Sequence, residues 1–275
     1  MIKRELIQGV PCKHEQNDGD SMLWAGLLYA ATGAPHISQG ITRSQSPGEW
    51  KRDAFGSLYF KQHGRLWRSP ARVNNDTENS FSRDMTLGFL TACAYDAKNR
   101  KDGYGLHLDP LFAFVEYINQ IGKLCPDATD KRSTVTPAIW WQIHSVRLGL
   151  VRPLFAKTAW LLRPYLLISA LSSPSGYQRH LVVVHLYIQT ILHGRAKRGT
   201  LLWTAKMLAR KEPKNPFFLW LAGRDIEAKT IALELEAKAI TANGDGSQWF
   251  LERTDSENAW KDSCGHDFDF LRNLI

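Results

Sequence analysis

The chain has 275 residues, of which 44% are hydrophobic and 11% aromatic, which is enough to bury a sizeable core and excludes a mostly disordered chain. No apolar run reaches the ~18 residues needed to span a bilayer, so an integral membrane protein is not expected. The first ten residues are charged and lack a long apolar core, which predicts synthesis in the cytoplasm without a secretory signal peptide. The sequence does not indicate the final location of the protein.

The net charge is +8, and the positive charge is unevenly distributed. Between Lys131 and Lys211 the chain has 13 Lys and Arg residues and no Asp or Glu. Such a stretch favours an anionic partner, which is an acidic glycan, a phosphate-bearing polymer, nucleic acid or anionic lipid.

Motifs for cofactors and metals are absent from the sequence. The four cysteines are widely spread and form no CxxC pair, which argues against a local zinc knuckle. The glycine-rich phosphate-binding motifs, the G-x-S-x-G elbow and the H-E-x-x-H zinc motif do not occur. We therefore predict neither a cofactor nor a required metal.

In chain order, the hydrophobic spacing predicts helices along most of the chain. Residues 48–63 are predicted as the second helix, because Trp50, Phe55 and Leu58 fall on one face, and residues 65–79 as a loop. The other predicted helices are 21–32, 82–97, 110–123, 137–150, 156–171, 176–193, 200–211, 215–243 as one or two helices, and 259–274. The β-branched run within 176–193 leaves a strand as the alternative there. With about nine to eleven helices, no hairpin and no linker, we expect one all-α domain over residues 1–275.

Three predicted helix starts share a polar lead, an aspartate and then an amphipathic helix. Their aspartates are Asp20, Asp84 and Asp262. Taken singly, each is typical of a helix cap, because a carboxylate there accepts backbone N–H groups and suits the helix dipole. Taken together, they predict an acid site, because helical hairpins that close into a ring bring the starts of their inner helices to one end.

The segments around these starts resemble the helical hairpins of (α/α) toroid proteins, many of which are glycoside hydrolases or polysaccharide lyases. The segments are DGDSMLWAGLLYAATG, RSPARVNNDTENSFSRDMTLGFL and QWFLERTDSENAWKDSCGHDFDFLRNLI. The resemblance is one of layout over most of the chain. It implies helical hairpins in a toroid-like ring, or an incomplete ring because the chain is short, with a cleft across one end. An unrelated helical bundle is the alternative.

The resemblance also implies that the cleft is lined with tryptophan, arginine and carboxylate side chains. Aromatic rings stack on sugar rings, and guanidinium groups pair with carboxylate or phosphate groups. The residues beside the predicted helix starts that would bind substrate are Trp67, Arg68, Arg72, Arg83, Trp249, Glu252, Arg253, Trp260 and Lys261.

Hydrolysis of a glycoside needs two carboxyl groups, one as acid and one as base or nucleophile. Asp84 and Asp262 are the first candidate pair, and Asp20 is the third candidate. An adjacent Arg83 or Lys261 would lower the pKa of its neighbouring aspartate, whereas a general acid needs burial or a nearby like charge. At most one of the three is therefore expected to be the acid.

Elimination in an acidic polysaccharide is the alternative reaction. A His or Tyr base removes the proton beside the sugar carboxylate, and arginine neutralises that carboxylate. His266 follows Asp262 by four residues, so one helix would place both on the same side. His14 and His107 are further candidates in polar segments.

These observations predict a carbohydrate-active enzyme, a hydrolase or a lyase, that cleaves a bacterial-surface or acidic polysaccharide. The alternative is a non-catalytic protein of the virion or effector type, whose basic surface binds nucleic acid, a phosphate-bearing glycan or anionic lipid. A membrane-surface protein is a third class, because residues 150–171 mix Trp, Leu and basic residues, although a buried helical hairpin is favoured for that segment.

Overall fold

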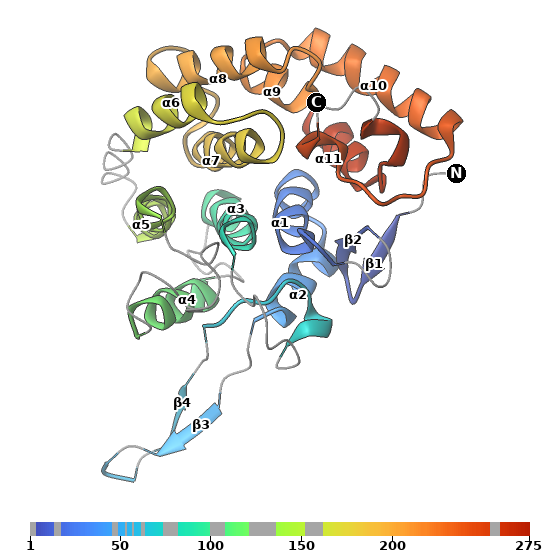
Figure 1. Ribbon diagram of the computed structural model, residues 1–275. Coiled ribbons are helices and arrows are strands. Elements are labelled where there is room, and N and C mark those ends of the chain that lie inside the picture. The colour runs from blue at the N-terminus through green and yellow to red at the C-terminus, as the bar shows by residue number, and fades with distance from the viewer. Residues whose placement is uncertain are drawn as a thin grey trace.

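The computed structural model describes residues 4–13, 18–45, 49–52, 54–56, 58–61, 64–73, 82–99, 108–120, 136–151, 162–253 and 259–275. Within these ranges the protein is mostly helical, as predicted (Figure 1). The α-helices are α1 (Ser21–Thr32), α2 (Pro35–Arg43), α3 (Arg83–Asn99), α4 (Leu108–Gln120), α5 (Pro137–Val151), α6 (Leu162–Ser172), α7 (Tyr177–His193), α8 (Thr200–Lys211), α9 (Pro216–Leu221), α10 (Asp225–Ala242) and α11 (His266–Leu274). None of the described helices is both long and apolar enough to cross a membrane.

Local signals explain where several helices begin and end. Helix α1 ends at Gly33, whose φ of 67° is the left-handed conformation that glycine adopts without steric cost. Helix α9 begins at Pro216, and the side chain of Asn215 caps it by accepting the N–H groups of Phe217 and Phe218. The β-branched segment predicted as helix or strand is the helix α7.

The prediction of a helix over residues 48–63 and of no hairpin is wrong. Strands β3 (Glu49–Arg52) and β4 (Leu58–Lys61) pair antiparallel there, and Gly56 in their turn has a φ of 81°. Each strand is rich in aromatic or long side chains, which suit a strand as well as a helix, so apolar spacing alone did not separate the two. A second hairpin, β1 (Glu5–Ile7) and β2 (Val10–Cys12), precedes α1.

The predicted continuous helix over residues 259–274 is also interrupted. A 3-10 helix, η5 (Ala259–Asp262), ends before Gly265, whose φ is 88°, and α11 starts after it. Because a left-handed residue cannot continue an α-helix, the residues before and after Gly265 do not share one helical face. Helix α2, which begins at Pro35 directly after α1, was not predicted.

Helices α1 and α3 pack against each other at the centre of the fold (Figure 1). Their backbones meet at Gly26 and Gly88, where a Cβ on Gly26 would lie 1.8 Å from the carbonyl oxygen of Gly88. Glycine is therefore required on both sides of this contact. Helix α3 also contacts α5 and α7, and α1 contacts α2 and α11.

Aromatic side chains join α1 to the C-terminal part of the chain. The indole of Trp24 stacks on that of Trp249 with ring centroids 4.8 Å apart, and Phe270 of α11 meets Trp24 edge-on at 6.1 Å. All three side chains are fully buried. This packing fixes the first turns of α1 against η4 (Phe250–Glu252), the 3-10 helix that follows Trp249.

Candidate active site

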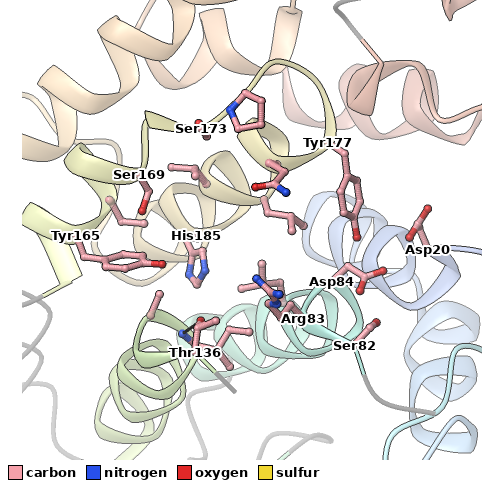
Figure 2. Close-up of a pocket in the computed structure, with 18 of the residues that line it drawn as sticks. Asp20, Ser82, Arg83, Asp84, Thr136, Tyr165, Ser169, Ser173, Tyr177 and His185 are labelled. Carbon is pink, nitrogen blue, oxygen red and sulfur yellow. Dashed lines mark hydrogen bonds between the residues drawn. The ribbon is translucent and has the colours of Figure 1, made fainter. Parts of the chain in front are cut away.

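A cavity of about 670 Å³ opens at the end of the fold where α1, α3, α5 and α7 begin and α6 ends (Figure 2). The charged and polar side chains that line it are Asp20, Arg68, Ser82, Arg83, Asp84, Thr136, Tyr165, Ser169, Ser172, Ser173, Tyr177, Gln178, His185 and Arg253. The volume is in the range of cavities that bind small molecules or a few sugar units.

Asp20 stands directly before α1, yet its side chain does not cap the helix. Its backbone is left-handed, with a φ of 62°, a conformation that is uncommon for a residue other than glycine. Its carboxyl group instead interacts with the carboxyl group of Asp84, in the first turn of α3, and this interaction raises the pKa of Asp20. Two of the three predicted helix-start aspartates therefore meet at the cavity wall.

The pKa of Asp20 is raised from 3.8 to about 7. Burial is the largest cause, and hydrogen bonding and the negative charge of Asp84 act in the same direction. The ammonium group of Lys13 lies 3.7 Å from the Asp20 carboxylate and opposes this shift. Asp20 is therefore poised to hold or release a proton near neutral pH.

Glu252 lies behind this pair and is almost completely buried. Its carboxyl oxygen accepts a hydrogen bond of 2.9 Å from the indole N–H of Trp24. Burial raises the pKa of Glu252 well above its usual value, and the negative charge of Asp20 adds to the shift. Three acidic groups from α1, α3 and η4 therefore interact at one end of the cavity.

The phenol of Tyr177, in the first turn of α7, donates a hydrogen bond to Asp84. Burial and the nearby acids raise the pKa of this phenol, so it stays protonated. Figure 2 shows Tyr177 over the Asp20 and Asp84 carboxyl groups. Tyr177 was not among the predicted site residues, although its position directly after Gly176 at a helix start resembles that of the predicted aspartates.

The other end of the cavity is polar but not acidic (Figure 2). His185 lies there with Tyr165, Ser169 and Thr136. Burial lowers the pKa of His185 to about 4, so its imidazole is neutral, and its Nδ1 lies 3.3 Å from the Oε1 of Gln142. None of these residues was predicted, because the segments around them were interpreted as buried helices.

Three of the predicted arginines, Arg68, Arg83 and Arg253, line the cavity. Arg72 does not, because its guanidinium pairs with the carboxylate of Asp18 through Nε at 3.0 Å and Nη2 at 3.2 Å. The same carboxylate accepts a 2.7 Å hydrogen bond from the Ser69 hydroxyl. These contacts hold the segment that carries Arg68 beside the start of α1.

The three predicted tryptophans lie outside the cavity lining. Trp67 and Trp249 are buried, with the Arg65 guanidinium 4.3 Å from the Trp67 ring and Trp249 donating a 3.0 Å hydrogen bond to the Gly19 carbonyl. Trp260 is half-buried, and the Lys261 ammonium lies 5.7 Å from its ring. The aromatic side chains at the cavity are Tyr165 and Tyr177.

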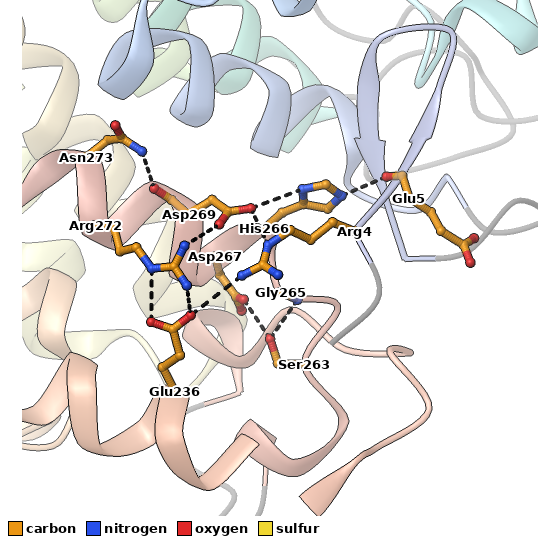
Figure 3. Close-up of polar contacts among 10 residues, drawn as sticks. All are labelled: Arg4, Glu5, Glu236, Ser263, Gly265, His266, Asp267, Asp269, Arg272 and Asn273. Atoms are coloured by element: carbon orange, nitrogen blue, oxygen red, sulfur yellow. Dashed lines mark hydrogen bonds and ion pairs between the residues drawn. The ribbon is translucent and has the colours of Figure 1, made fainter. Parts of the chain in front are cut away.

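Asp262 and His266 are also outside the cavity lining. The backbone carbonyl of Asp262 accepts the N–H of Gln248 at 2.9 Å, and its Cα packs against Gly244. His266 is buried, with Nε2 2.7 Å from the Glu5 carbonyl oxygen (Figure 3). His14 and His107 lie outside the described residues.

Comparison with known proteins gave no relative. No protein-family model matches the sequence, and neither a curated protein nor a solved structure matches the chain.

Proposed function

We propose that the cavity is the active site of a carbohydrate-active enzyme that hydrolyses an acidic polysaccharide. The observation that carries the proposal is the interacting pair of Asp20, whose pKa is raised, and Asp84 at the wall of a cavity that three arginines also line. A protonated carboxyl group beside a second carboxyl group is the acid and base combination that glycoside hydrolysis needs.

In the proposed reaction Asp20 gives its proton to the glycosidic oxygen as the bond between that oxygen and the anomeric carbon breaks. Asp84 removes a proton from the water molecule whose oxygen forms the new bond to the anomeric carbon. The proton then returns from Asp84 to Asp20, so one water is consumed and both carboxyl groups regain their starting state. The Tyr177 hydroxyl, which donates to Asp84, orients this base.

The carboxyl groups of most glycosidases are about 5–9.5 Å apart. In the proposed reaction a glycosidic bond enters between Asp20 and Asp84 and takes the place of their mutual interaction. Lys13, at 3.7 Å from Asp20, is placed to stabilise the separated carboxylate.

Hydrolysis is favoured over elimination because the cavity lacks a suitable base for elimination among its described residues. The raised pKa of Tyr177 disfavours its phenolate, and the pKa of about 4 makes His185 a weak base. His266, the base expected for elimination, lies elsewhere and contacts the Glu5 carbonyl.

The acidic nature of the substrate is inferred from Arg68, Arg83 and Arg253. Guanidinium groups bind sugar carboxylate, sulfate or phosphate groups through paired hydrogen bonds. Their placement along the cavity would offset the repulsion between an anionic substrate and the three acidic side chains.

We further propose that the helices form an (α/α) toroid-like ring. Support comes from the alternation along the chain of inner helices (α1, α3, α5, α7, α9 and α11) with peripheral ones (α2, α4, α6, α8 and α10) (Figure 1). Contacts join α1 to α3, α3 to α5, α5 to α7, α7 to α9 and α11 to α1. The rings of Phe217 and Phe270, 5.0 Å apart, join α9 to α11.

The test is product formation from a panel of acidic and bacterial-surface polysaccharides, with reducing ends and unsaturated ends measured on the same samples. We expect new reducing ends without unsaturation. Asp84→Asn and Asp20→Asn should each lower kcat by about 10² to 10⁴-fold, the range for loss of a general acid or base.

Asp262→Asn is the matched control, because it changes the third helix-start aspartate, which lies outside the cavity lining. It should retain wild-type activity. Unsaturated products would show that the reaction is elimination and not hydrolysis. Equal losses in all three variants, or no product from the folded protein across the panel, would contradict the assignment of the cavity as the catalytic centre.

A further inference from the structure

Large apolar side chains are exposed on two helices that pack side by side, α6 and α8 (Figure 1). Ile168 and Leu171 of α6 are 62% and 57% exposed, and Trp203 of α8 is 72% exposed. Exposed apolar side chains are ordinary when scattered, but a group of them on adjoining elements indicates a contact surface.

Cationic side chains surround these apolar ones. Arg163 of α6 and Lys206 and Arg210 of α8 are exposed. Ile168 lies near Leu171 on the exposed face of α6, and Trp203, Lys206 and Arg210 follow one another at helical spacing on α8. The six residues form what we call the α6–α8 face.

One contact fixes how the two helices lie relative to each other. The Lys211 ammonium, at the end of α8, donates hydrogen bonds of 3.0 and 2.6 Å to the carbonyl oxygens of Ala170 and Leu171, near the end of α6. The C-terminal ends of the two helices are therefore adjacent.

The face contains no acidic residue, since α6, α7 and α8 lie within the stretch from Lys131 to Lys211 that has no Asp or Glu. The nearest acid in the sequence, Glu212, is buried and paired with the guanidinium of Arg179. The exposed charge of this face is therefore positive only.

We propose that the α6–α8 face docks onto the surface of an anionic lipid bilayer. Trp and aliphatic side chains enter the headgroup region of a bilayer, while Lys and Arg extend to the lipid phosphates and carboxylates. Anionic lipid attracts each nearby cation, and the effect weakens as salt screens the charges. This inference does not depend on the proposed activity of the cavity.

A bilayer fits the face better than nucleic acid does. Phosphates of a nucleic acid would pair with the three cations, and a base could stack on Trp203. Ile168 and Leu171 would gain nothing from that contact and would stay exposed. In a bilayer all six side chains find a suitable environment.

Helix α10 provides a contrast within the same molecule. Its Ile226 and Leu233 are 86% and 56% exposed, which matches the exposure on α6. Acidic residues lie beside them, including Asp225, Glu227 and Glu234. Asp225 and Glu227 pair with Arg195 and Arg224, so the charge around these side chains is mixed and not positive only. An anionic bilayer would gain little attraction from this helix, so α10 supplies matched control positions.

The test is co-sedimentation of the full chain with phosphatidylcholine vesicles, prepared with and without phosphatidylserine. We expect binding to the vesicles that contain phosphatidylserine and little to the others, with affinity falling as salt is raised. Ile168→Ser combined with Leu171→Ser should lower the partition coefficient about tenfold. Lys206→Ala and Arg210→Ala should each lower it about fivefold.

The control is Ile226→Ser combined with Leu233→Ser, which removes equally exposed aliphatic side chains from α10 and should leave binding unchanged. All six sites are exposed, and circular dichroism verifies that each variant is folded. Equal loss in the control, equal binding to vesicles without phosphatidylserine, or binding to single-stranded nucleic acid but not to vesicles would overturn the proposal.

Discussion

Two regions of the molecule contain clusters of acidic and basic side chains, and the side chains are paired differently in each. At the cavity, Asp20 and Asp84 interact, and the pKa of Asp20 is raised. In the terminal clasp, defined here as Arg4, Glu236, Asp269 and Arg272, each carboxylate is bound by arginine (Figure 3). Arg4 Nε lies 2.7 Å from Asp269, and Arg272 Nε lies 3.1 Å from Glu236.

The two regions contain the same residue types and differ in how far their carboxylates are neutralised by cations. In the clasp two guanidinium groups balance two carboxylates, so the cluster joins the N-terminal strand to α10 and α11 without excess charge. At the cavity three acids interact with one another, and the positive charges of Lys13 and Arg68 only partly offset the upward shift in the pKa of Asp20. A protein retains such an imbalance at a cost in stability, which is typical of a functional site and not of a structural one.

The largest effect is expected from Gly88→Ala, which tests whether the α1–α3 contact sets the carboxyl pair. The new Cβ would lie 2.2 Å from the carbonyl oxygen of Met22 and 2.4 Å from the Cα of Leu23, so the helices must separate. Unfolding free energy should fall by about 3 kcal/mol, measured by urea denaturation. Any folded fraction should lose activity, because Asp20 and Asp84 move apart.

Gly199→Ala is the control for this variant, since nothing lies within 4 Å of its Cβ and its φ is 80°. It should cost about 1 kcal/mol, from backbone strain alone. A similar loss of stability in the two variants would show that close packing of α1 on α3 is not the cause.

The second effect concerns stability against pH and compares wild type with Asp20→Asn. The pKa of Asp20 is raised by folding from 3.8 to about 7, so its protonated form is favoured in the folded state. The stabilisation it provides is complete below pH 4 and is lost as pH rises through 7. Asn cannot titrate and tolerates the left-handed backbone at this position.

The unfolding free energy of the variant should therefore rise relative to that of wild type between pH 4 and pH 8, by on the order of 3 kcal/mol. Thermal or urea unfolding over this pH range measures the difference. If the curves of unfolding free energy against pH stay parallel for the two proteins, folding does not raise the pKa of Asp20 and its proposed role as the acid is wrong.

The smallest effect is expected in the clasp, where Glu236→Ala removes the carboxylate bound by Arg272. The Glu236 side chain is only 10% exposed, but Arg272 is 52% exposed and regains water contacts. We expect a loss of about 1–2 kcal/mol, larger than the about 0.5 kcal/mol expected for Glu227→Ala, whose pair with Arg224 is exposed on both sides. Equal losses would mean that the clasp is an ordinary surface ion pair.

Helical periodicity predicted most helices because their apolar faces are defined by neighbouring residues. It also placed Asp20 and Asp84 at helix starts, and the structure brings these two together. Periodicity could not show that they would interact, because this depends on Gly26 and Gly88 bringing two helices into backbone contact. It also could not show the raised pKa of Asp20, whose largest cause is burial by distant segments.

The rest of the site depends on contacts between distant segments. Glu252 looked like an exposed substrate ligand, but the indole of Trp24, 228 residues away, covers it. Tyr177 and His185 occur in a strongly apolar segment, so the pattern favoured a core position for both. Asp262 and His266 were predicted to share a helix, which the left-handed Gly265 prevents.

The Trp24–Glu252 hydrogen bond also indicates at what stage of folding the acid cluster forms. A contact between segments 228 residues apart forms only after a large loss of chain entropy, so it is expected late in folding. During synthesis, α1 and α3 emerge early and can pack through their glycines while Trp24 still lacks Trp249 and Glu252. The acid cluster is therefore assembled among the last parts of the fold, and a nascent chain with most of its helices in place would still lack it.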